Sequence, residues 1–122
     1  MPAEYTALVE ALKALTQGES PDPVFTLPMA EDEWNTRPDT VSYGTVRLDF
    51  EADALRGDNV KQCTAWEGSV DLYSLNRDGA GWVELITATL TAHCEGAWSL
   101  NYHGYERATS LFHWEWAFQV EE

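Results

Sequence analysis

The segment LFHWEWAFQV, residues 111–120, decides the fold of this chain, because it alternates with a strict period of two. Its large apolar side chains fall on one face: Phe112, Trp114, Trp116, Phe118 and Val120. The other face carries His113, Glu115, Ala117 and Gln119. Such alternation is typical of a half-buried β-strand. A strand with so many aromatics needs a sheet beside it and an apolar layer over it.

The rest of the chain supplies both. Residues 3–16 place Tyr5, Leu8, Val9, Leu12 and Leu15 on one stripe of an expected helix. Residues 81–95 form a second expected helix, which Gly96 ends. Strands are expected over 40–52 and 61–74, and a fourth carries Trp98, Leu100 and Tyr102 on one face. Residues 103–106 are expected to turn the chain into the final strand.

This order of elements, helix–strand–strand–helix–strand–strand, predicts the fold class. We expect one α+β domain over residues 1–122. Its sheet is antiparallel or mixed, with about four main strands, and the two helices pack on one face. The 122 residues, 44% of them hydrophobic, are sufficient for a core of their own.

Two details of the expected strands concern side-chain direction. In the strand over 40–52, the apolar Val46, Leu48 and Phe50 face one way, whereas Arg47, Asp49 and Glu51 face the other. Gly68, in the next strand, has the parity of an inward residue and is interpreted as a bend or bulge.

The charge balance limits the function. Twenty-one acidic residues against seven basic ones give a formal net charge of −14. Direct, sequence-specific nucleic-acid binding is not expected, because it needs a basic stripe and the basic residues are scattered. The absence of an 18-residue apolar run argues against a membrane span, and the acidic N-terminus does not resemble a signal peptide. Solubility alone would explain the charge; repulsion of DNA, imitation of DNA or a basic partner remain alternatives.

Sites for chemistry are few. The sequence has no phosphate-binding glycine loop, HExxH, GxSxG or CxxC motif, so we expect no enzyme and no cofactor. Cys63 and Cys94 are expected to be free, mostly buried thiols in a reducing cytoplasm. The remaining metal-ligating types match no common zinc spacing, so no metal is expected. This set comprises His93, Cys94, His103, His113 and Cys63.

Two polar surfaces leave alternatives open. The outward face of the last strand, with His113, Glu115 and Gln119, is expected to be solvated, although His113 and Glu115 could form an acid–base pair. The outer side of the second helix carries small residues, among them Ala88, Thr91 and Ala92. That side is either an ordinary weakly polar surface or one suited to close packing against another subunit.

Several segments together resemble a known family. The leading helix reads EYTALVEALKAL, a strand ends in SVDLYSLNRDG, the next helix starts at Trp82-Val83-Glu84, and the chain closes with RATSLFHWEWAFQVE. This pattern, which spans nearly the whole chain, resembles the tail terminator (tail completion) proteins of tailed phages. The most specific part is the strand Val70-Asp71-Leu72-Tyr73-Ser74, followed by a polar turn and a helix.

The resemblance implies a structural virion protein that is assembled in the cytoplasm of the host bacterium. It implies a self-assembled ring, typically a hexamer, which caps the tail tube and joins it to the head–tail connector protein. The expected partners are therefore other copies of the chain, the tail tube protein and that connector. A negative ring would repel the DNA that passes through it. The residues proposed for the interface or the lumen are Glu31, Asp32, Glu33, Trp34, Asp49 and Glu51.

A second hypothesis belongs to another class. A compact domain with a net charge of −14 could imitate DNA and inhibit a nucleic-acid-binding protein. Such an inhibitor needs carboxylates arrayed along one surface, and its binding should weaken steeply with salt.

Overall fold

A computed structural model describes residues 3–17, 25–26, 29–30, 43–55 and 61–121. The helices and strands follow in chain order. They are α1 (Ala3–Lys13), β1 (Thr16–Gln17), β2 (Phe25–Thr26), β3 (Met29–Ala30), β4 (Tyr43–Leu55), β5 (Lys61–Ser74), the 3₁₀ turn η1 (Gly79–Gly81), α2 (Trp82–His93), β6 (Trp98–Glu106) and β7 (Leu111–Glu121). The predicted order of two helices and four main strands is confirmed.

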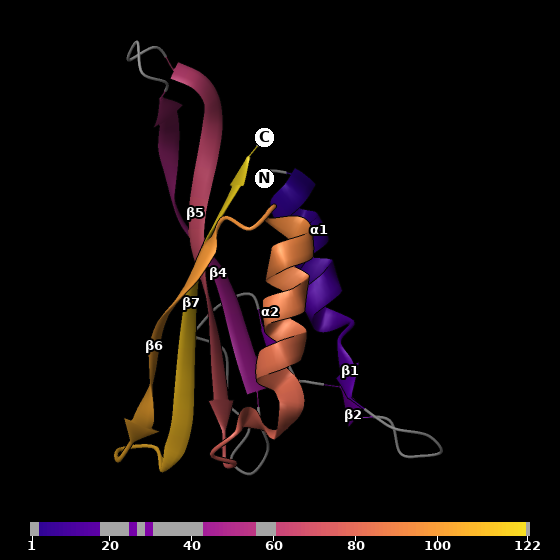
Figure 1. Ribbon diagram of the computed structural model, residues 1–122, viewed down its shortest axis with the longest axis vertical. Helices are drawn as coiled ribbons and strands as arrows, with labels where there is room; N and C mark the ends of the chain where they lie inside the picture. The colour runs from indigo at the N-terminus through magenta and orange to yellow at the C-terminus, as the bar shows by residue number, and fades with distance from the viewer. Residues whose placement is uncertain (1–2, 18–24, 27–28, 31–42, 56–60, 122) are drawn as a thin grey trace.

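The main sheet has five strands in the order β3-β4-β5-β7-β6. The four long strands pair antiparallel, and the two-residue β3 pairs parallel with one end of β4. The short β1 and β2 pair with each other outside this sheet. Both helices lie on the same side of the sheet (Figure 1). The architecture is therefore the expected α+β class, with a mixed sheet and helices on one face.

The aromatic face of β7 lies in the core between the sheet and the helices. Trp114, Trp116, Phe118 and Val120 are all buried there, and Trp116 is completely so. The two helices contribute one apolar stripe each. Those helix residues are Tyr5, Leu8, Val9 and Leu12 of α1 and Trp82, Ile86 and Leu90 of α2. The interpretation of residues 111–120 as a half-buried strand is confirmed.

A bulge interrupts the alternation of β4. The register shifts between Leu48 and Phe50, so Phe50 pairs with Glu67 and Glu51 pairs with Trp66. The unbroken alternation predicted over residues 46–50 is therefore not observed, because the extra residue shifts the register of β4 by one. The side chain of Phe50 lies outside the described residues. Position 49 is the residue inserted.

Gly68 lies opposite Leu48, beside that bulge. A Cβ atom there would come within 2.4 Å of the Arg47 carbonyl oxygen and 2.5 Å of Phe118 Cζ. Only glycine lets the Phe118 ring and the bulged strand approach so closely. The bend or bulge expected at Gly68 is therefore found in the neighbouring strand, at position 49 of β4, whereas β5 itself keeps an unbroken register with β7 at Gly68.

The β6–β7 hairpin differs from expectation in two respects. Residues 103–106 belong to β6, and the turn lies at 107–110, where Ser110 has a φ of 60°. A register shift between Leu100 and Tyr102 places Tyr102 opposite Glu115, whereas Leu100 lies opposite Trp116. Tyr102 is therefore on the face away from the helices, and the assumption of unbroken alternation in this strand was wrong.

The β4–β5 hairpin extends beyond the body of the protein. The pairing of β5 with β7 ends at Ala65, opposite Glu121, whereas β4 and β5 remain paired as far as Leu55 and Lys61. In Figure 1 the two strands rise well past the ends of both helices. This two-stranded extension is called the ribbon below.

Candidate functional site

The sheet face opposite the helices carries polar side chains, and here it is called the polar face. Strand pairing decides which residues share it, because residues directly opposite in an antiparallel pair point the same way. Asp71 of β5 lies opposite Glu115 of β7, and Tyr73 lies opposite His113. On the other side of β5, Thr45 of β4 lies opposite Asp71. Three neighbouring strands therefore bring these groups together.

His113 lies at the centre of this face and contacts two carboxylates. Its Nε2 is 2.6 Å from Asp71 Oδ1, and its Nδ1 is 2.9 Å from Glu106 Oε2. With both carboxylates ionised, both ring nitrogens donate and the imidazole is protonated. Burial alone would lower the pKa of His113. The hydrogen bond and charge of Asp71, together with those of Glu106, outweigh burial and raise that pKa above its usual value.

Aromatic rings enclose the imidazole. Tyr73 stacks on His113 with ring centroids 4.3 Å apart, and Tyr43 stacks on Tyr73 at 4.8 Å. Tyr102 lies against the imidazole in a tilted arrangement at 5.2 Å. Tyr43, Tyr73 and Leu111 form a small hydrophobic cluster separate from the main core. The π faces of these rings favour a cationic imidazole.

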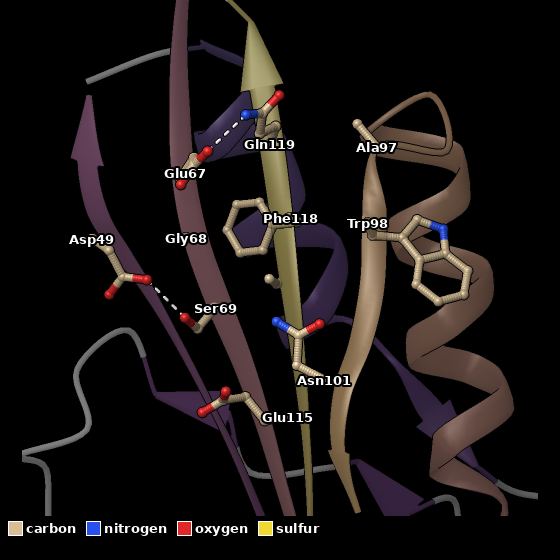
Figure 2. A pocket seen from close by; sticks show the side chains of 11 residues that line it. Asp49, Glu67, Gly68, Ser69, Ala97, Trp98, Asn101, Glu115, Phe118 and Gln119 are labelled. Atoms are coloured by element: carbon tan, nitrogen blue, oxygen red, sulfur yellow. Dashed lines mark hydrogen bonds between the residues drawn. The ribbon is translucent and has the colours of Figure 1, made fainter. Parts of the chain in front are cut away.

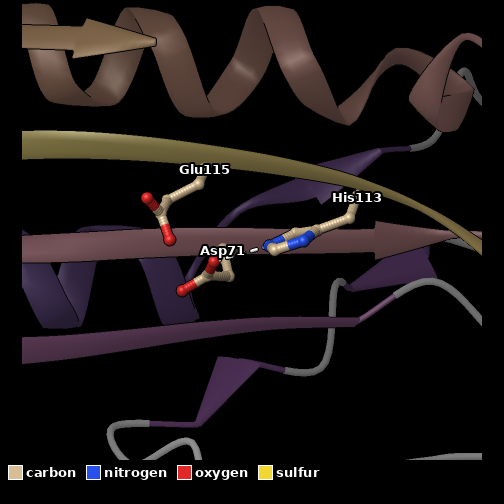
Figure 3. A group of neighbouring side chains, drawn as sticks. All are labelled: Asp71, His113 and Glu115. Atoms are coloured by element: carbon tan, nitrogen blue, oxygen red, sulfur yellow. Dashed lines mark hydrogen bonds and ion pairs between the residues drawn. The ribbon is translucent and has the colours of Figure 1, made fainter. Parts of the chain in front are cut away.

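Glu115 completes the group with Asp71 and His113 (Figure 3). One ligand atom from each of the three side chains lies within 4.8 Å of the others. Burial, followed by the negative charge of Asp71, raises the pKa of Glu115. Among the described residues, these three form the group whose side chains could jointly bind a metal ion.

A shallow hollow of about 400 Å³ lies farther along the polar face (Figure 2). Asp49, Glu67 and Glu115 contribute its carboxylates. Ser69 Oγ donates to Asp49 Oδ2 at 2.7 Å, and Gln119 Nε2 donates to Glu67 Oε1 at 2.8 Å. Arg47 Nε donates to the other oxygen of Asp49 at 2.6 Å. The hollow is suited to hydrogen-bond donors and cations rather than to phosphates.

The proposed interface or lumen residues are only partly visible. Glu31, Asp32, Glu33 and Trp34 lie outside the described residues, as does the side chain of Glu51. Asp49 is exposed and occupies the β4 bulge. Asp49 and Glu51 are expected to share an outward face. The bulge at Asp49 shifts the register, so that the backbone of Glu51 pairs opposite Trp66, and the face of the Glu51 side chain stays a prediction.

The candidate ligands from the sequence are separated in the structure. His103 stacks on Trp114 at 4.5 Å, on the helix side of the sheet, and His93 ends α2. Cys94 is a free, buried thiol, as predicted, and burial raises its pKa to about 11. The side chain of Cys63 lies outside the described residues.

The solvated face predicted for the end of the chain is wrong at His113. That side chain is buried, and it bonds Asp71 and Glu106 rather than forming an acid–base pair with Glu115. The missed residue is Asp71, which is 42 positions away in the sequence. An acidic residue between the apolar Val70 and Leu72 was the available signal.

Comparisons with known proteins give no family. No family model matches the chain, and no curated protein matches it. Within the described part of the chain, neither helix has the length and apolar character that crossing a membrane requires.

Proposed function

We propose that this protein is a structural component of a tailed-phage virion, the tail terminator. It forms a ring of identical subunits that caps the tail tube and joins it to the head–tail connector. The order of helices and strands, which the sequence resemblance requires, supports this proposal. The observation that carries it is the exposed apolar edge formed by β6.

β6 is the last strand of the sheet and pairs only with β7 among the described strands. Three of its large apolar side chains are exposed: Leu100 by 45%, Tyr102 by 44% and Tyr105 by 51%. Soluble proteins usually protect such an edge with charges, prolines or a covering segment, because unpaired backbone groups invite another chain. An edge left open and apolar is suited to a partner, and in a ring that partner is the next subunit.

A closed ring needs a second surface that differs from the first, because each subunit meets one neighbour on either side. The outer side of α2 supplies a candidate. Ala88, Thr91 and Ala92 are exposed there, and their small side chains permit close approach of a neighbouring backbone or aromatic ring. Of the two interpretations of this helix surface, the proposal therefore adopts close packing against another subunit.

The charge of the chain supports a passage for DNA. A ring of six subunits, each with a formal net charge of −14, would repel the phosphate backbone and let it slide. The assignment of Glu31, Asp32 and Glu33 to the lumen and of Trp34 to an interface stays part of this proposal.

The edge can be tested with one variant and one matched control. Leu100→Glu places a charge on the exposed edge, whereas Leu75→Glu changes an equally exposed leucine, 52% accessible, that lies just beyond β5. We expect the wild-type protein and Leu75→Glu to form rings in the presence of tail tube protein, and Leu100→Glu to remain monomeric. Light scattering and electron microscopy measure the assemblies, and circular dichroism checks the fold. Wild-type protein that stays monomeric on tubes, or a Leu100→Glu protein that still assembles, would refute the proposal.

The acidic hollow favours a second candidate, an inhibitor that imitates DNA. Asp49, Glu67 and Glu115 gather there on one surface. A mimic would bind a basic DNA-binding protein in competition with DNA. Its affinity for that protein would fall steeply as the salt concentration rises from about 50 to about 200 mM, as the affinity of proteins for DNA phosphates does. A monomer that shows this competition would support the mimic and oppose the terminator.

A further inference from the structure

The group of Asp71, His113 and Glu115 has the geometry of a metal-binding site. One ligand atom from each residue lies within 4.8 Å of the others. Asp71 and Glu115 are directly opposite in the β5–β7 pairing, and His113 is two residues from Glu115 on the same face (Figure 3). All three stand on central strands of the sheet, which hold ligands more accurately than loops do.

The donor types indicate a particular class of cation. An imidazole nitrogen with two carboxylates is a ligand set of the kind that zinc accepts, with a fourth position left for water. Glu106 Oε2, 2.9 Å from Nδ1 of His113, occupies the place of the outer carboxylate that orients metal-bound histidines. That contact fixes the ring with Nε2 directed at Asp71.

The charges of the group also call for a cation. Three carboxylates, those of Asp71, Glu106 and Glu115, surround one imidazole, and Asp71 is only 4% exposed. Even a protonated imidazole leaves an excess of negative charge beside the buried carboxylate of Asp71, which is unfavourable there, whereas Glu106 and Glu115 are partly exposed. The guanidinium of Arg47 offsets part of this excess at Glu115.

We propose that Asp71, His113 and Glu115 bind one divalent transition-metal cation of the Zn²⁺ class. The cation replaces the proton between His113 Nε2 and Asp71 Oδ1, which are 2.6 Å apart without it. These two atoms move apart to roughly 3 Å as the ion binds, the proton is released to solvent, and the ion links β5 to β7. Glu115, which is half-buried, provides the side from which the ion enters. This inference does not depend on the proposed virion function.

Calorimetric titration of the chelator-treated protein with ZnCl₂ tests the site. We expect the wild-type protein to bind one Zn²⁺ per chain. Glu115→Gln should lose at least tenfold in affinity, and Glu106→Gln about 10- to 100-fold through the outer contact. Glu67→Gln changes a carboxylate on the same face that accepts a hydrogen bond from Gln119; it is the matched control and should bind as wild type. Both Glu115→Gln and Glu67→Gln change partly exposed residues, so folding should survive.

Nuclear magnetic resonance of the three histidines identifies the ligand. Zn²⁺ should shift the Nε2 resonance of His113 and leave those of His93 and His103 unchanged. The proposal is overturned if the wild-type protein binds no Zn²⁺, if the shift appears at His93 or His103 instead, or if Glu115→Gln binds as tightly as wild type.

Discussion

The two faces of the sheet bury different kinds of side chain: apolar ones on the helix face and hydrogen-bonded polar ones on the polar face. On the helix face, β7 presents Trp114, Trp116 and Phe118 to an apolar layer made by α1 and α2. On the polar face, the same strand buries His113 against Asp71, and neither of the two described helices lies above it. The first face is stabilised mainly by apolar area removed from water, and the second by the hydrogen bonds between His113 and its two carboxylates. The fold therefore depends on one face, and any specific chemistry is to be sought on the other.

The largest effect should come from the helix face. Trp116 is completely buried, so Trp116→Ala should lower the free energy of unfolding by roughly 4 kcal/mol through lost burial and a cavity. Trp116→Phe should recover much of this, since the indole Nε1 has no hydrogen-bond partner among the described residues. Urea unfolding measures both. Gln119→Ala, three residues along the strand and exposed, is the control, with an expected change within about 0.5 kcal/mol. A small loss for Trp116→Ala would mean that the helices do not cover this strand.

The next effect should come from the polar face. His113→Ala leaves Asp71 buried without its partner, which should cost about 3 kcal/mol in urea unfolding with a chelator present. A double-mutant cycle with Asp71→Ala should show strong coupling, because the second change removes the stranded carboxylate. If the two effects simply add, the contact between these residues does not contribute to stability.

A third comparison uses two glycines. Gly68→Ala would place a methyl group 2.4 Å from the backbone oxygen of Arg47, which cannot move easily, and should cost about 1–3 kcal/mol. In Gly104→Ala the nearest atom is the hydroxyl of Tyr102, 2.5 Å away at the end of a 44%-exposed side chain that can turn aside. This change should cost less than about 1 kcal/mol. Thermal unfolding of both proteins checks the difference, and equal losses would contradict the tight approach of Phe118 to β5.

The smallest effect concerns the thiol of Cys94 in the core. Its pKa is raised from 9.0 to about 11 by burial, so the thiolate at pH 8 is reduced by on the order of 100-fold in the folded protein. Alkylation of Cys94, followed by mass spectrometry of its peptide, should be slow in buffer and fast in urea. The neutral thiol also favours the folded state below pH 9, and this contribution should be lost as the pH rises towards 11. Equal alkylation rates in the two solvents would show that the end of α2 is open.

The sequence predicted the helix face well because its signals are local. The period of two in β7 and the helical stripes of α1 and α2 can be recognised within a dozen residues. The bulges at Asp49 and Asn101 were not predicted, because an extra residue in one strand is visible only against its partner. The bulge at Asn101 places Tyr102 on the face opposite to the one expected.

The polar face was missed for a related reason. A histidine two residues from a glutamate in a strand normally indicates a solvated surface. The contact between His113 and Asp71 depends on the pairing of β5 with β7, and the contact with Glu106 depends on where the last hairpin turns. Neither can be read from the residues around His113 alone.

The ribbon formed by the far ends of β4 and β5 can change in length without disturbing the core. Among the described strands, its outer rungs pair only with each other, between positions 53–55 and 61–64. Removing two residues from each strand would shorten it by about 7 Å and keep every remaining side chain on its own face. The reach of the protein can thus change stepwise, in units of paired residues, while the covered aromatic layer and its helices stay as they are.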